Sequence, residues 1–512
     1  MALPINNVNK LHAVLPPNAK PWYRQGHLVK LNFCLISCMM YASTNGYDGT
    51  LLNGFQSLNR WVDFMEDPDA TWLGTINCLY WITVGVVAPV SSWAAGKWGR
   101  KIPSYCGFIF LIASTCLQAM AQNPAMFIVA RTILGGSTAC FGIAVPLLIA
   151  ELAYPTQRAI MSNLYPAGFF VGSSISAWSV YGMRNYASSW CWRLPTILQV
   201  LCPLSGLVGL YLSPESPRWL ISEGRIEDAR QILVDWHAGG DTNSALVEFE
   251  MAEIIEAVRA EKEASGTARF SDLWKGPGNR HRLFITITIG FFAQWVGNNV
   301  VSYYLALVLD TVGVTSADDQ TLVSACLQFW NLIFAVIGAL FIDRLGRRMI
   351  FQLSFAIMLV SYVIVTGLSG SFASTGNAST GLAVIPFLFV FYAGYGISLT
   401  PLLIAYPLEI WTFQLRALGL SVVWMSTVVS VVFNVFVNPI ALSAIGWKYY
   451  LVFVAVLVSY GVTAYYFYPE TRGYTLEEMA IVFDGDKAAL AAVQHIEGLT
   501  VHHEQDEKPT KQ

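Results

Sequence analysis

Charged residues are scarce in this chain of 512 residues. Asp, Glu, Lys and Arg make up 12% of the sequence, against 55% for the hydrophobic residues. A soluble protein of this length needs a charged surface, so the composition indicates that lipid surrounds most of the chain. The formal net charge is -3, and the Lys and Arg residues form no single basic face, so we expect no nucleic-acid partner.

Catalytic and cofactor-binding patterns are also missing. The nine cysteines are spread among apolar runs and fit neither a disulfide framework nor a zinc site. No glycine-rich loop could cradle a phosphate, and no helix carries paired histidines on one face. The N-terminal residues lack a short apolar core followed by a cleavage site, so the first helix would stay in the membrane. We therefore expect no metal, no cofactor and no enzyme, with an ion gradient as the energy source.

Long apolar runs are what the sequence does contain. Each is long enough to cross a bilayer core of roughly 30 Å, and it should do so as a helix because unpaired backbone groups are too costly in lipid. We expect an all-α membrane protein with twelve transmembrane helices, at approximately 28–56, 71–95, 102–121, 125–150, 160–182, 193–212, 282–309, 321–342, 347–368, 382–406, 418–440 and 447–468.

A polar stretch divides these runs into six and six. The expected domains are an N-terminal segment at 1–27, a first bundle at 28–212, a linker at 213–281, a second bundle at 282–468 and a tail at 469–512. The linker has amphipathic patterns around 226–235 and 248–263, which favour a solvated cytoplasmic segment over a catalytic one. Short loops rich in Lys and Arg alternate with acidic or uncharged loops, so both termini should be cytoplasmic.

Three motifs occur twice, in the same order and about 250 residues apart. The turn Gly96–Lys101 recurs as Asp343–Arg348, the pair Glu151 and Arg158 recurs as Glu409 and Arg416, and Pro214–Arg218 recurs as Pro469–Gly473. This spacing predicts a duplicated six-helix unit, and therefore two pseudo-symmetric bundles. Such bundles bind their substrate between them, near the middle of the membrane.

Cationic turns in these motifs are repeated together with glutamates. A tight glycine turn brings arginines close to helix ends and to a glutamate, where ion pairs form when the inner side is closed. We interpret the motifs as an inner gate; the alternative is that the same arginines only anchor the loops at the inner surface. The predicted gate residues are Arg100, Glu151, Arg158, Asp343, Arg347, Glu409 and Arg416.

Two ionisable residues fall within or beside apolar runs of the first bundle. Asp48 lies in the first run, and Arg131 opens the fourth. Charges at such a depth are costly unless they pair or line water, and they indicate function. A carboxylate that faces Arg131 in one state and water in another takes up and releases a proton. We interpret the two as a proton-coupling pair; the alternative is that Asp48 caps a helix end and Arg131 snorkels.

Polar, uncharged residues gather in the seventh run. A sugar offers hydroxyls and apolar ring faces, which amides and aromatic rings bind. Buried amides in membrane helices need partners, so this cluster predicts a ligand, with hydrogen bonding between helices as the alternative. For Trp178 the alternative is a place in the interfacial belt of aromatic residues. The predicted substrate-binding residues are Gln294, Trp295, Asn298, Asn299, Tyr303, Tyr304, Asn434, Asn438 and Trp178.

These motifs resemble the sugar porter family of the major facilitator superfamily over nearly the whole chain. The likeness rests on Gly46-Tyr47-Asp48, Arg131 with Gly135 and Gly136, Trp192-Arg193, Gln294 to Tyr304, and the repeated motifs above. Within the family the chain looks most like the fungal lactose permease and cellodextrin transporter branch, judging by 294–299, 401–403, 437–442 and 446–450. The resemblance implies the major facilitator fold, with Asp48 as proton carrier and Arg131 as its partner.

The chain also departs from the family pattern in places that touch its substrate. The family's inner-loop acid is Gly96 here, the first of its paired glutamines is Ala293, and its fifth-helix glutamine is Pro166. The common tenth-helix tryptophan falls at Ile404. These changes suit a disaccharide or a non-standard ligand better than a monosaccharide.

The sequence thus predicts a monomeric plasma-membrane importer that moves a sugar together with a proton by alternating access. Its partners would be the sugar, the proton and membrane lipid, and the sugar would be a disaccharide such as lactose or cellobiose. A sequon at Asn377, in a predicted outer loop, is compatible with glycosylation. Two other functions remain open: a sugar sensor with little flux, and a transporter of another sugar, a polyol or a small metabolite.

Overall fold

The computed structural model describes residues 15, 21–267, 269–412, 415–472, 479, 482 and 483, and these residues form helices without any β-strand. Most of the expected N-terminal segment and of the expected tail lies outside the described residues. We call α2 to α11 the first half and α15 to α22 the second half.

The first half contains six membrane helices, some of them in two pieces, and short helices at their ends. Its elements are α2 (Gly26–Met39), α3 (Ser43–Phe55), α4 (Asn59–Phe64), α5 (Ala70–Trp98), α6 (Lys101–Ala119), α7 (Pro124–Leu152), α8 (Arg158–Leu164), α9 (Ala167–Met183), α10 (Trp190–Leu198) and α11 (Leu201–Leu212).

The linker and the second half follow in the chain. The linker forms α12 (Pro217–Ser222), α13 (Ile226–Trp236) and α14 (Ala245–Thr267). The second half forms α15 (Pro277–Trp295), α16 (Asn298–Asp310), α17 (Ala317–Leu345), α18 (Arg347–Thr375), α19 (Ala378–Leu382), α20 (Val384–Ile410), α21 (Arg416–Ile445) and α22 (Tyr450–Phe467).

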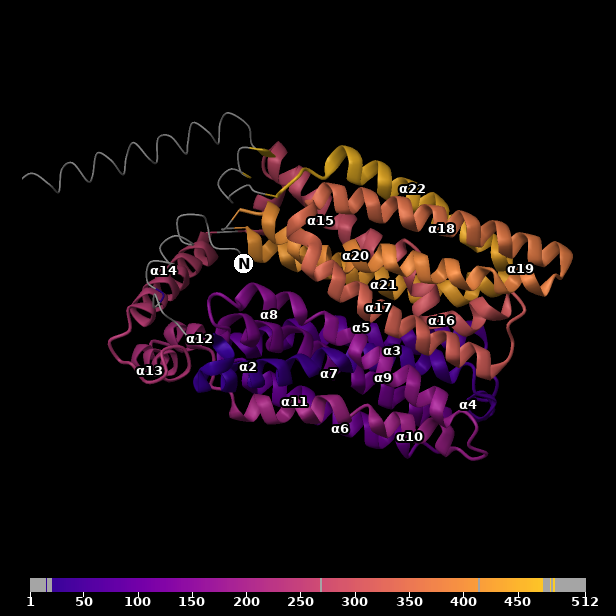
Figure 1. Cartoon of the computed structure of the whole chain (residues 1–512), viewed down its shortest axis with the longest axis horizontal. Helices are drawn as coiled ribbons and strands as arrows, with labels where there is room; N and C mark the ends of the chain where they lie inside the picture. The colour runs from indigo at the N-terminus through magenta and orange to yellow at the C-terminus, as the bar shows by residue number, and fades with distance from the viewer. Residues whose placement is uncertain are drawn as a thin grey trace, which may run out of the picture.

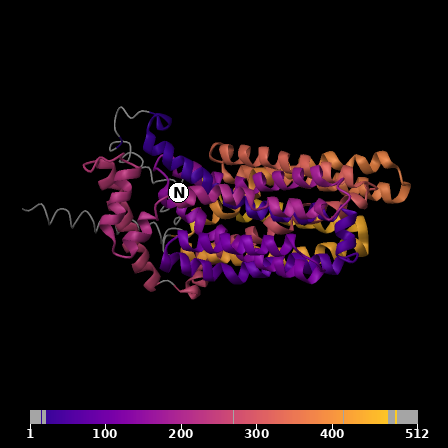
Figure 2. The ribbon, with the colours of Figure 1, turned by 90° about the horizontal axis from the view of Figure 1, so that it is seen from below.

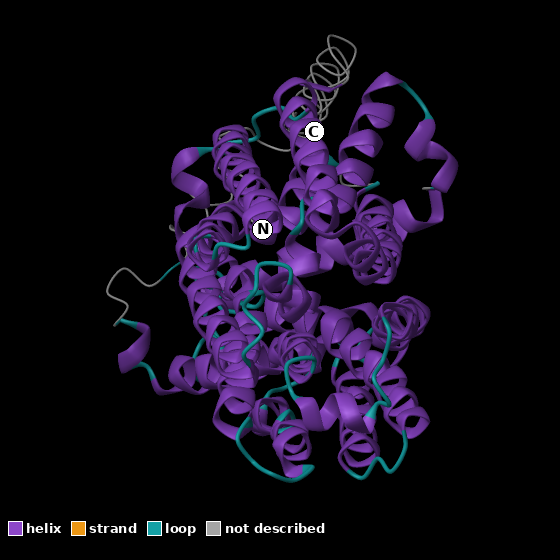
Figure 3. Ribbon diagram, turned by 90° about the vertical axis from the view of Figure 1, so that its right-hand side faces the viewer, coloured by secondary structure: helices purple, strands orange, loops and turns teal. Residues whose placement is uncertain are grey.

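The two halves lie side by side with their helices roughly parallel to the long axis (Figure 1). Figure 3 looks along that axis and shows the helices of both halves end-on. The linker helices α12 to α14 lie beyond one end of the bundles in both side views (Figures 1 and 2). We call that end the linker end and the opposite one, where α4 and α19 lie, the far end.

Nine stretches of the described residues are long and apolar enough to cross a membrane. One of them, 418–467, holds both α21 and α22. Two more membrane helices fall short of such a stretch, because α2 and α3 are separated by a 3-10 turn at Met40–Ala42 and α9 has only 17 residues. With these the chain has the twelve membrane helices of the major facilitator fold, as the sequence predicts.

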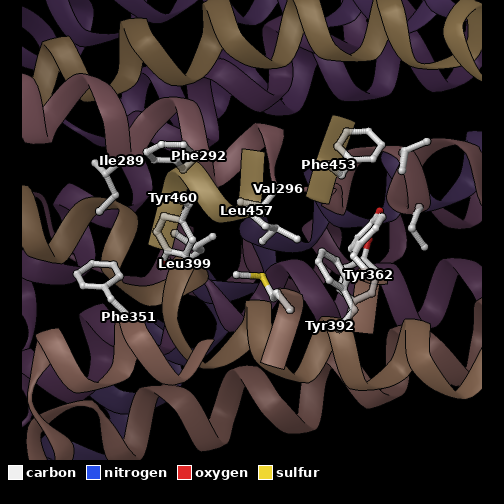
Figure 4. Close-up of a cluster of buried hydrophobic side chains, with 14 of the residues drawn as sticks. Ile289, Phe292, Val296, Phe351, Tyr362, Tyr392, Leu399, Phe453, Leu457 and Tyr460 are labelled. Carbon is white, nitrogen blue, oxygen red and sulfur yellow. The ribbon is translucent and has the colours of Figure 1, made fainter. Parts of the chain in front are cut away.

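Each half has its own apolar core, and a further core joins them at the far end. Figure 4 shows the core of the second half, with Phe351 at one end and Tyr362 and Tyr392 towards the other. The shared core brings buried residues of α3, such as Leu51, together with Tyr304 of α16 and residues of α21. At the same interface Gly74 of α5 meets Phe436 so closely that a Cβ atom on Gly74 would lie 2.8 Å from the Phe436 carbonyl oxygen.

The linker has an apolar core of its own, although its sequence predicts a solvated segment. Its amphipathic helices do form, but their apolar faces are covered by one another, because Leu233 of α13 and Val247 and Met251 of α14 share a core with Leu220 of α12. The ammonium group of Lys30, on α2, lies 4.4 Å from the ring centroid of Trp236. The linker is therefore a small packed unit that contacts the first half, and not only a solvated segment.

Candidate functional site

Asp48 and Arg131 form a buried ion pair in the interior of the first half. Asp48 lies in the middle of α3 and Arg131 in the second turn of α7, and each side chain is only 1% exposed. The two terminal nitrogens of Arg131 donate to the two carboxylate oxygens of Asp48, at 2.8 and 3.1 Å. Two parallel hydrogen bonds between an arginine and a carboxylate make the strongest form of this ion pair. Sequence analysis predicts these two residues as a pair, and their role in proton coupling remains a prediction.

Tyr80 of α5 lies against this pair. The guanidinium carbon of Arg131 lies 5.7 Å from the Tyr80 ring centroid. The Tyr80 hydroxyl donates to Asn45 Oδ1, at 3.2 Å, and makes a second hydrogen bond of 2.8 Å with the Thr138 hydroxyl. Next to Tyr80, the Trp81 ring nitrogen donates to the hydroxyl of Tyr303 in the second half, at 3.2 Å. The pair is therefore connected to the second half through neighbouring aromatic residues.

The seventh membrane helix is broken in two, as α15 and α16. The break falls at Gly297, whose φ of +101° is a conformation that other residues rarely adopt. A Cβ atom there would lie 2.4 Å from the hydroxyl oxygen of Tyr362, and that hydroxyl donates to the Gly297 carbonyl at 2.8 Å. Broken membrane helices are tolerated where protein groups replace the lost backbone bonds, and they commonly line substrate sites.

Three of the predicted amides, Gln294 of α15 and Asn298 and Asn299 of α16, lie on either side of this break. Asn299 Nδ2 donates to Gln294 Oε1 at 3.0 Å, and Asn298 Nδ2 donates to Asn299 Oδ1 at 3.1 Å. On α21, Asn438 Nδ2 donates to Asn434 Oδ1 at 2.8 Å. Among these predicted amides, two buried atoms have no hydrogen-bond partner within the described residues: the acceptor Asn298 Oδ1 and the donor Asn434 Nδ2. A ligand with hydroxyl groups matches both, because a hydroxyl donates and accepts.

Trp295 lies in an aromatic stack beside the amides. Its ring is nearly parallel to that of Phe291, at 5.4 Å between centroids, and to that of Phe433, at 5.5 Å. Trp178 lies elsewhere: its side chain is 46% exposed and its ring contacts Tyr181 of its own helix. No hydrogen bond or ring contact described for Trp178 connects it with the amide cluster, so the structure does not bring this predicted residue to the others.

A second break, at Tyr304 within α16, is closed by the other half. Tyr304 has φ and ψ of −138° and 33°, which leaves neighbouring backbone groups without helical partners. Asn53 of α3 and Gln56, which follows α3, bind these groups: Asn53 Oδ1 accepts from the Leu305 N–H at 2.8 Å, and Gln56 Nε2 donates to the Tyr303 carbonyl at 2.8 Å. The Tyr304 hydroxyl accepts from Asn77 Nδ2 at 3.0 Å. We call Asn53 and Gln56 the far-end latch.

An ion pair adds to the contacts between the halves at the far end. Arg184, which follows α9, donates to the carboxylate of Asp318 at the start of α17. The Arg184 guanidinium carbon also lies 3.8 Å from the Tyr181 ring centroid. This pair was not predicted, because both residues lie in loops between apolar runs, where a charge is ordinary. The far end of the bundles is thus held closed by polar and apolar contacts together.

The inner-gate motif of the first half forms a connected network at the linker end. Arg100 donates to both carboxylate oxygens of Glu151, at 2.9 and 3.0 Å. Glu215, which follows α11, accepts from the backbone N–H groups of Arg100 and Lys101, at 3.0 and 3.2 Å. A carboxylate at the start of α6 is stabilised by the free N–H groups and by the helix dipole.

The second half repeats this network with its own residues. Arg347 donates to Glu409 at 2.8 Å, and the Thr471 hydroxyl donates to the same carboxylate. Glu470 accepts from the backbone N–H groups of Arg347 and Arg348, at 2.9 and 3.0 Å. Partial burial acts to raise the pKa of Glu470, but these and two further backbone hydrogen bonds hold it below its ordinary value.

Arg158 of the first motif faces the linker. Its guanidinium lies 3.9 Å from the Glu250 carboxylate of α14, and Glu250 accepts from His237 Nδ1 at 2.8 Å. The other ring nitrogen, Nε2, donates to the Leu152 carbonyl at 3.1 Å. Burial alone lowers the pKa of His237, but the carboxylate and the carbonyl oppose this and raise the pKa above its ordinary value. His237 and Glu250 are each 2% exposed and dock the linker onto α7.

The remaining predicted residues are placed as follows. Arg416 is buried at the start of α21. Asp343 lies in α17, but its side chain is outside the described part of the structure. Asn377 is exposed at the far end, where its Oδ1 accepts from the Ser379 N–H at the start of α19. Sequence reasoning missed Tyr80 and the far-end latch, although each is a polar residue inside an apolar run.

Comparison with known proteins places the chain in a family. The model of the family described as "Sugar (and other) transporter" matches residues 33–483. The chain belongs to this sugar transporter family. Because the family consists of transporters, the prediction that the chain is not an enzyme is confirmed. It is accordingly an integral membrane protein.

Individual relatives of this sugar transporter are distant. It is 28% identical to the MFS glucose transporter mfs1 of Aspergillus flavus, over 86% of this chain and 87% of the relative. It is 27% identical to the high-affinity glucose transporter of Kluyveromyces lactis, over 85% and 81%. Among solved structures it is similar to the proton:xylose symporter XylE of E. coli bound to 6-bromo-6-deoxy-D-glucose, with a TM-score of 0.71 and 21% identity, over 89% of this chain and 99% of XylE.

Proposed function

We propose that this sugar transporter imports its sugar together with a proton, with Asp48 as the proton carrier and Arg131 as its partner. The observation that carries the proposal is the fully buried, two-pronged contact between the two side chains. A carboxylate at this depth is stable as an anion only while Arg131 faces it, and otherwise it is better protonated. The resemblance to a proton:xylose symporter agrees with this role.

The substrate in this proposal binds between the halves, at the break between α15 and α16. Asn298 and Asn434 offer a free acceptor and a free donor, and Trp295 offers an aromatic face. The amides at the break and those of α21 belong to elements that pack against each other, which suits a ligand with many hydroxyls. We propose a disaccharide such as lactose or cellobiose, in line with the resemblance to the fungal lactose permease and cellodextrin transporter branch.

The transport cycle follows from the two ends of the molecule. The far end faces outwards, and it opens when the far-end latch and the pair of Arg184 with Asp318 separate. The linker end faces the cytoplasm, together with both termini, and its motifs serve as the inner gate by holding the helices of each half in place there. In this orientation Asn377 lies outside and is a candidate for glycosylation. The protein acts as a monomer in the plasma membrane.

The decisive experiment is uptake of labelled lactose or cellobiose in a host that lacks its own sugar carriers. Uptake should rise as the external pH falls, and an uncoupler should abolish accumulation. Asp48→Asn removes the titrating group and keeps its shape, so it should abolish accumulation against a gradient and leave exchange of sugar across the membrane. If Asp48→Asn accumulates sugar like the wild type, the coupling role is wrong.

A ligand panel tests the choice of substrate separately. Unlabelled disaccharides, monosaccharides, polyols and sugar acids would compete with the labelled sugar at one fixed pH. Competition by lactose or cellobiose at concentrations at least tenfold lower than by monosaccharides or polyols would support a disaccharide site. The opposite order would overturn the proposed substrate and leave the coupling proposal in place.

A further inference from the structure

Protonation of Asp48 would leave Arg131 with a charge that has lost its partner. Both terminal nitrogens of Arg131 donate to Asp48, and its Nε atom is buried without a hydrogen-bond partner among the described residues. An uncompensated cation in the membrane interior is costly, and arginine keeps its charge at any physiological pH. The protonated state of Asp48 therefore needs another group to stabilise Arg131.

Tyr80 has the position for this task. The Arg131 guanidinium lies over its ring, at 5.7 Å between the guanidinium carbon and the ring centroid. Tyrosine rings attract cations through their negative faces, most strongly away from water, and Tyr80 is only 2% exposed. The attraction is stronger when Asp48 is neutral, because the carboxylate otherwise offsets the charge of the guanidinium.

The ring is also held in a fixed place relative to both members of the pair. Its hydroxyl bonds to Thr138, on the helix that carries Arg131, and to Asn45, on the helix that carries Asp48. The backbone of α5 contacts α7 so closely that a Cβ atom on Gly135 would lie 2.4 Å from the Tyr80 carbonyl oxygen. The ring therefore stays beside Arg131 while Asp48 changes its protonation.

We propose that Tyr80 is a positioning residue that stabilises the Arg131 cation during the part of the cycle in which Asp48 is protonated. This inference rests on the proposed proton coupling. The titratable groups around the carboxylate are Arg131 from α7, Tyr80 from α5 and Tyr303 from α16. The two tyrosines stay neutral at physiological pH, so the balance of charge is set by Arg131 and Asp48.

Removal of the Tyr80 ring should shift the pH dependence of uptake to lower pH. Without the ring, the state with a neutral Asp48 and a charged Arg131 becomes less favourable. A higher proton concentration is then needed to protonate Asp48, so the half-maximal point of uptake moves to a lower external pH. From the strength of a buried cation–π contact, we expect a shift of about one pH unit, or about tenfold in proton concentration.

The test compares three variants of Tyr80 in the full-length protein. Tyr80→Phe keeps the ring and loses the hydroxyl, whereas Tyr80→Leu and Tyr80→Met lose the ring. Uptake of labelled sugar would be measured from pH 4.5 to pH 8, with the amount of protein at the membrane followed by a fused fluorescent protein. Tyr211→Leu is the matched control, because the Tyr211 side chain is 75% exposed on α11.

The expected result is a profile like the wild type for Tyr80→Phe and Tyr211→Leu, and an acid shift for Tyr80→Met and Tyr80→Leu. Lower rates with an unshifted profile in the ring-free variants would show a merely structural role and overturn the inference. If Tyr80→Leu fails to reach the membrane, Tyr80→Met decides, since the unbranched and flexible methionine side chain fills irregular space better. A wild type with no pH dependence would instead overturn the proposed proton coupling.

Discussion

The two halves share one arrangement of helices and differ in the polar residues that they carry in mid-membrane. At the linker end each half pairs an arginine with a glutamate and binds the start of a helix with a second glutamate, Glu215 or Glu470. In mid-membrane the first half holds a charged pair, whereas the second half holds amides around a broken helix. Duplication thus explains the common frame, and the differences are the basis on which we propose the proton for one half and the sugar for the other.

The amides provide the strongest test of this division. Asn298→Ala and Asn434→Ala should each raise the KM for sugar about tenfold or more, because a buried polar contact with the substrate is lost. Neither should shift the pH profile, since neither touches Asp48. Uptake kinetics at several pH values would measure both quantities. Asn32→Ala is the control, because the Asn32 amide donates only within its own helix, to the Leu28 carbonyl. A shifted pH profile with an unchanged KM would contradict the division.

The far-end latch tests how the halves communicate. Asn53→Ala and Gln56→Ala should each weaken the closed far end, because each leaves a backbone group of α16 unsatisfied at a cost of about 1 to 3 kcal/mol. A cysteine introduced at Ser57 should then react about five- to tenfold faster with a membrane-impermeant maleimide. Asn123→Ala removes a cap at the same end, but within the first half only, and should leave the rate unchanged. Equal rates in all three variants would show that the latch does not hold the gate.

The two copies of the inner-gate motif should contribute unequally to the stability of the protein. Glu151→Gln and Glu409→Gln remove matching partners, but the Glu151 side chain is 11% exposed and that of Glu409 is 29% exposed. The two arginines are about equally buried, but the carboxylate of Glu151 is less screened by solvent than that of Glu409, so its loss should cost more: about 2 kcal/mol in the first half and about 1 kcal/mol in the second. Thermal unfolding in detergent with a tryptophan fluorescence readout would measure the difference. The reverse order would mean that exposure does not set the strength of these pairs.

The linker contact should give the smallest effect, and one confined to the first half. The raised pKa of His237 means that its contribution is fully present below pH 6.5 and is lost as the pH rises through its folded-state pKa. Limited proteolysis of the linker should therefore speed up severalfold towards pH 8.5. In His237→Gln the rate of linker cleavage should not change with pH. The pH dependence of the protease itself would be measured on an unfolded substrate and subtracted. An identical rise in both proteins would exclude His237 as its source.

Much of the site could be predicted because charges and amides are conspicuous inside apolar runs. Asp48 and Arg131 stand out in this way, and burial leaves them little choice but to pair. Tyr80, Asn53 and Gln56 also make contacts with other helices, yet a single polar residue in a membrane helix usually binds its own backbone. Their partners lie on other helices, and nothing in the local sequence distinguishes the two cases.

The positions of the helix breaks and the docking of the linker are harder still to predict from the sequence. Gly297 follows an apolar run without any unusual pattern, and its conformation depends on the hydroxyl of Tyr362, 65 residues later. Arg158 was expected to belong to the inner gate because it repeats with Glu151, but its observed contact is with Glu250 in the linker. Sequence repetition identifies which residues correspond, whereas partners from the unrepeated linker depend on tertiary packing.

The break at Tyr304 has a consequence for the energy of opening. The groups that replace its lost helical bonds, on Asn53 and Gln56, belong to the opposite half and must withdraw when the far end opens. The cheapest replacement partners are then the neighbouring turns of α16 itself, so Tyr304 would return to helical angles. In the proposed cycle, opening the far end would then wind one turn of α16, and Tyr304→Ala, which introduces a better helix former, should favour the outward-facing form.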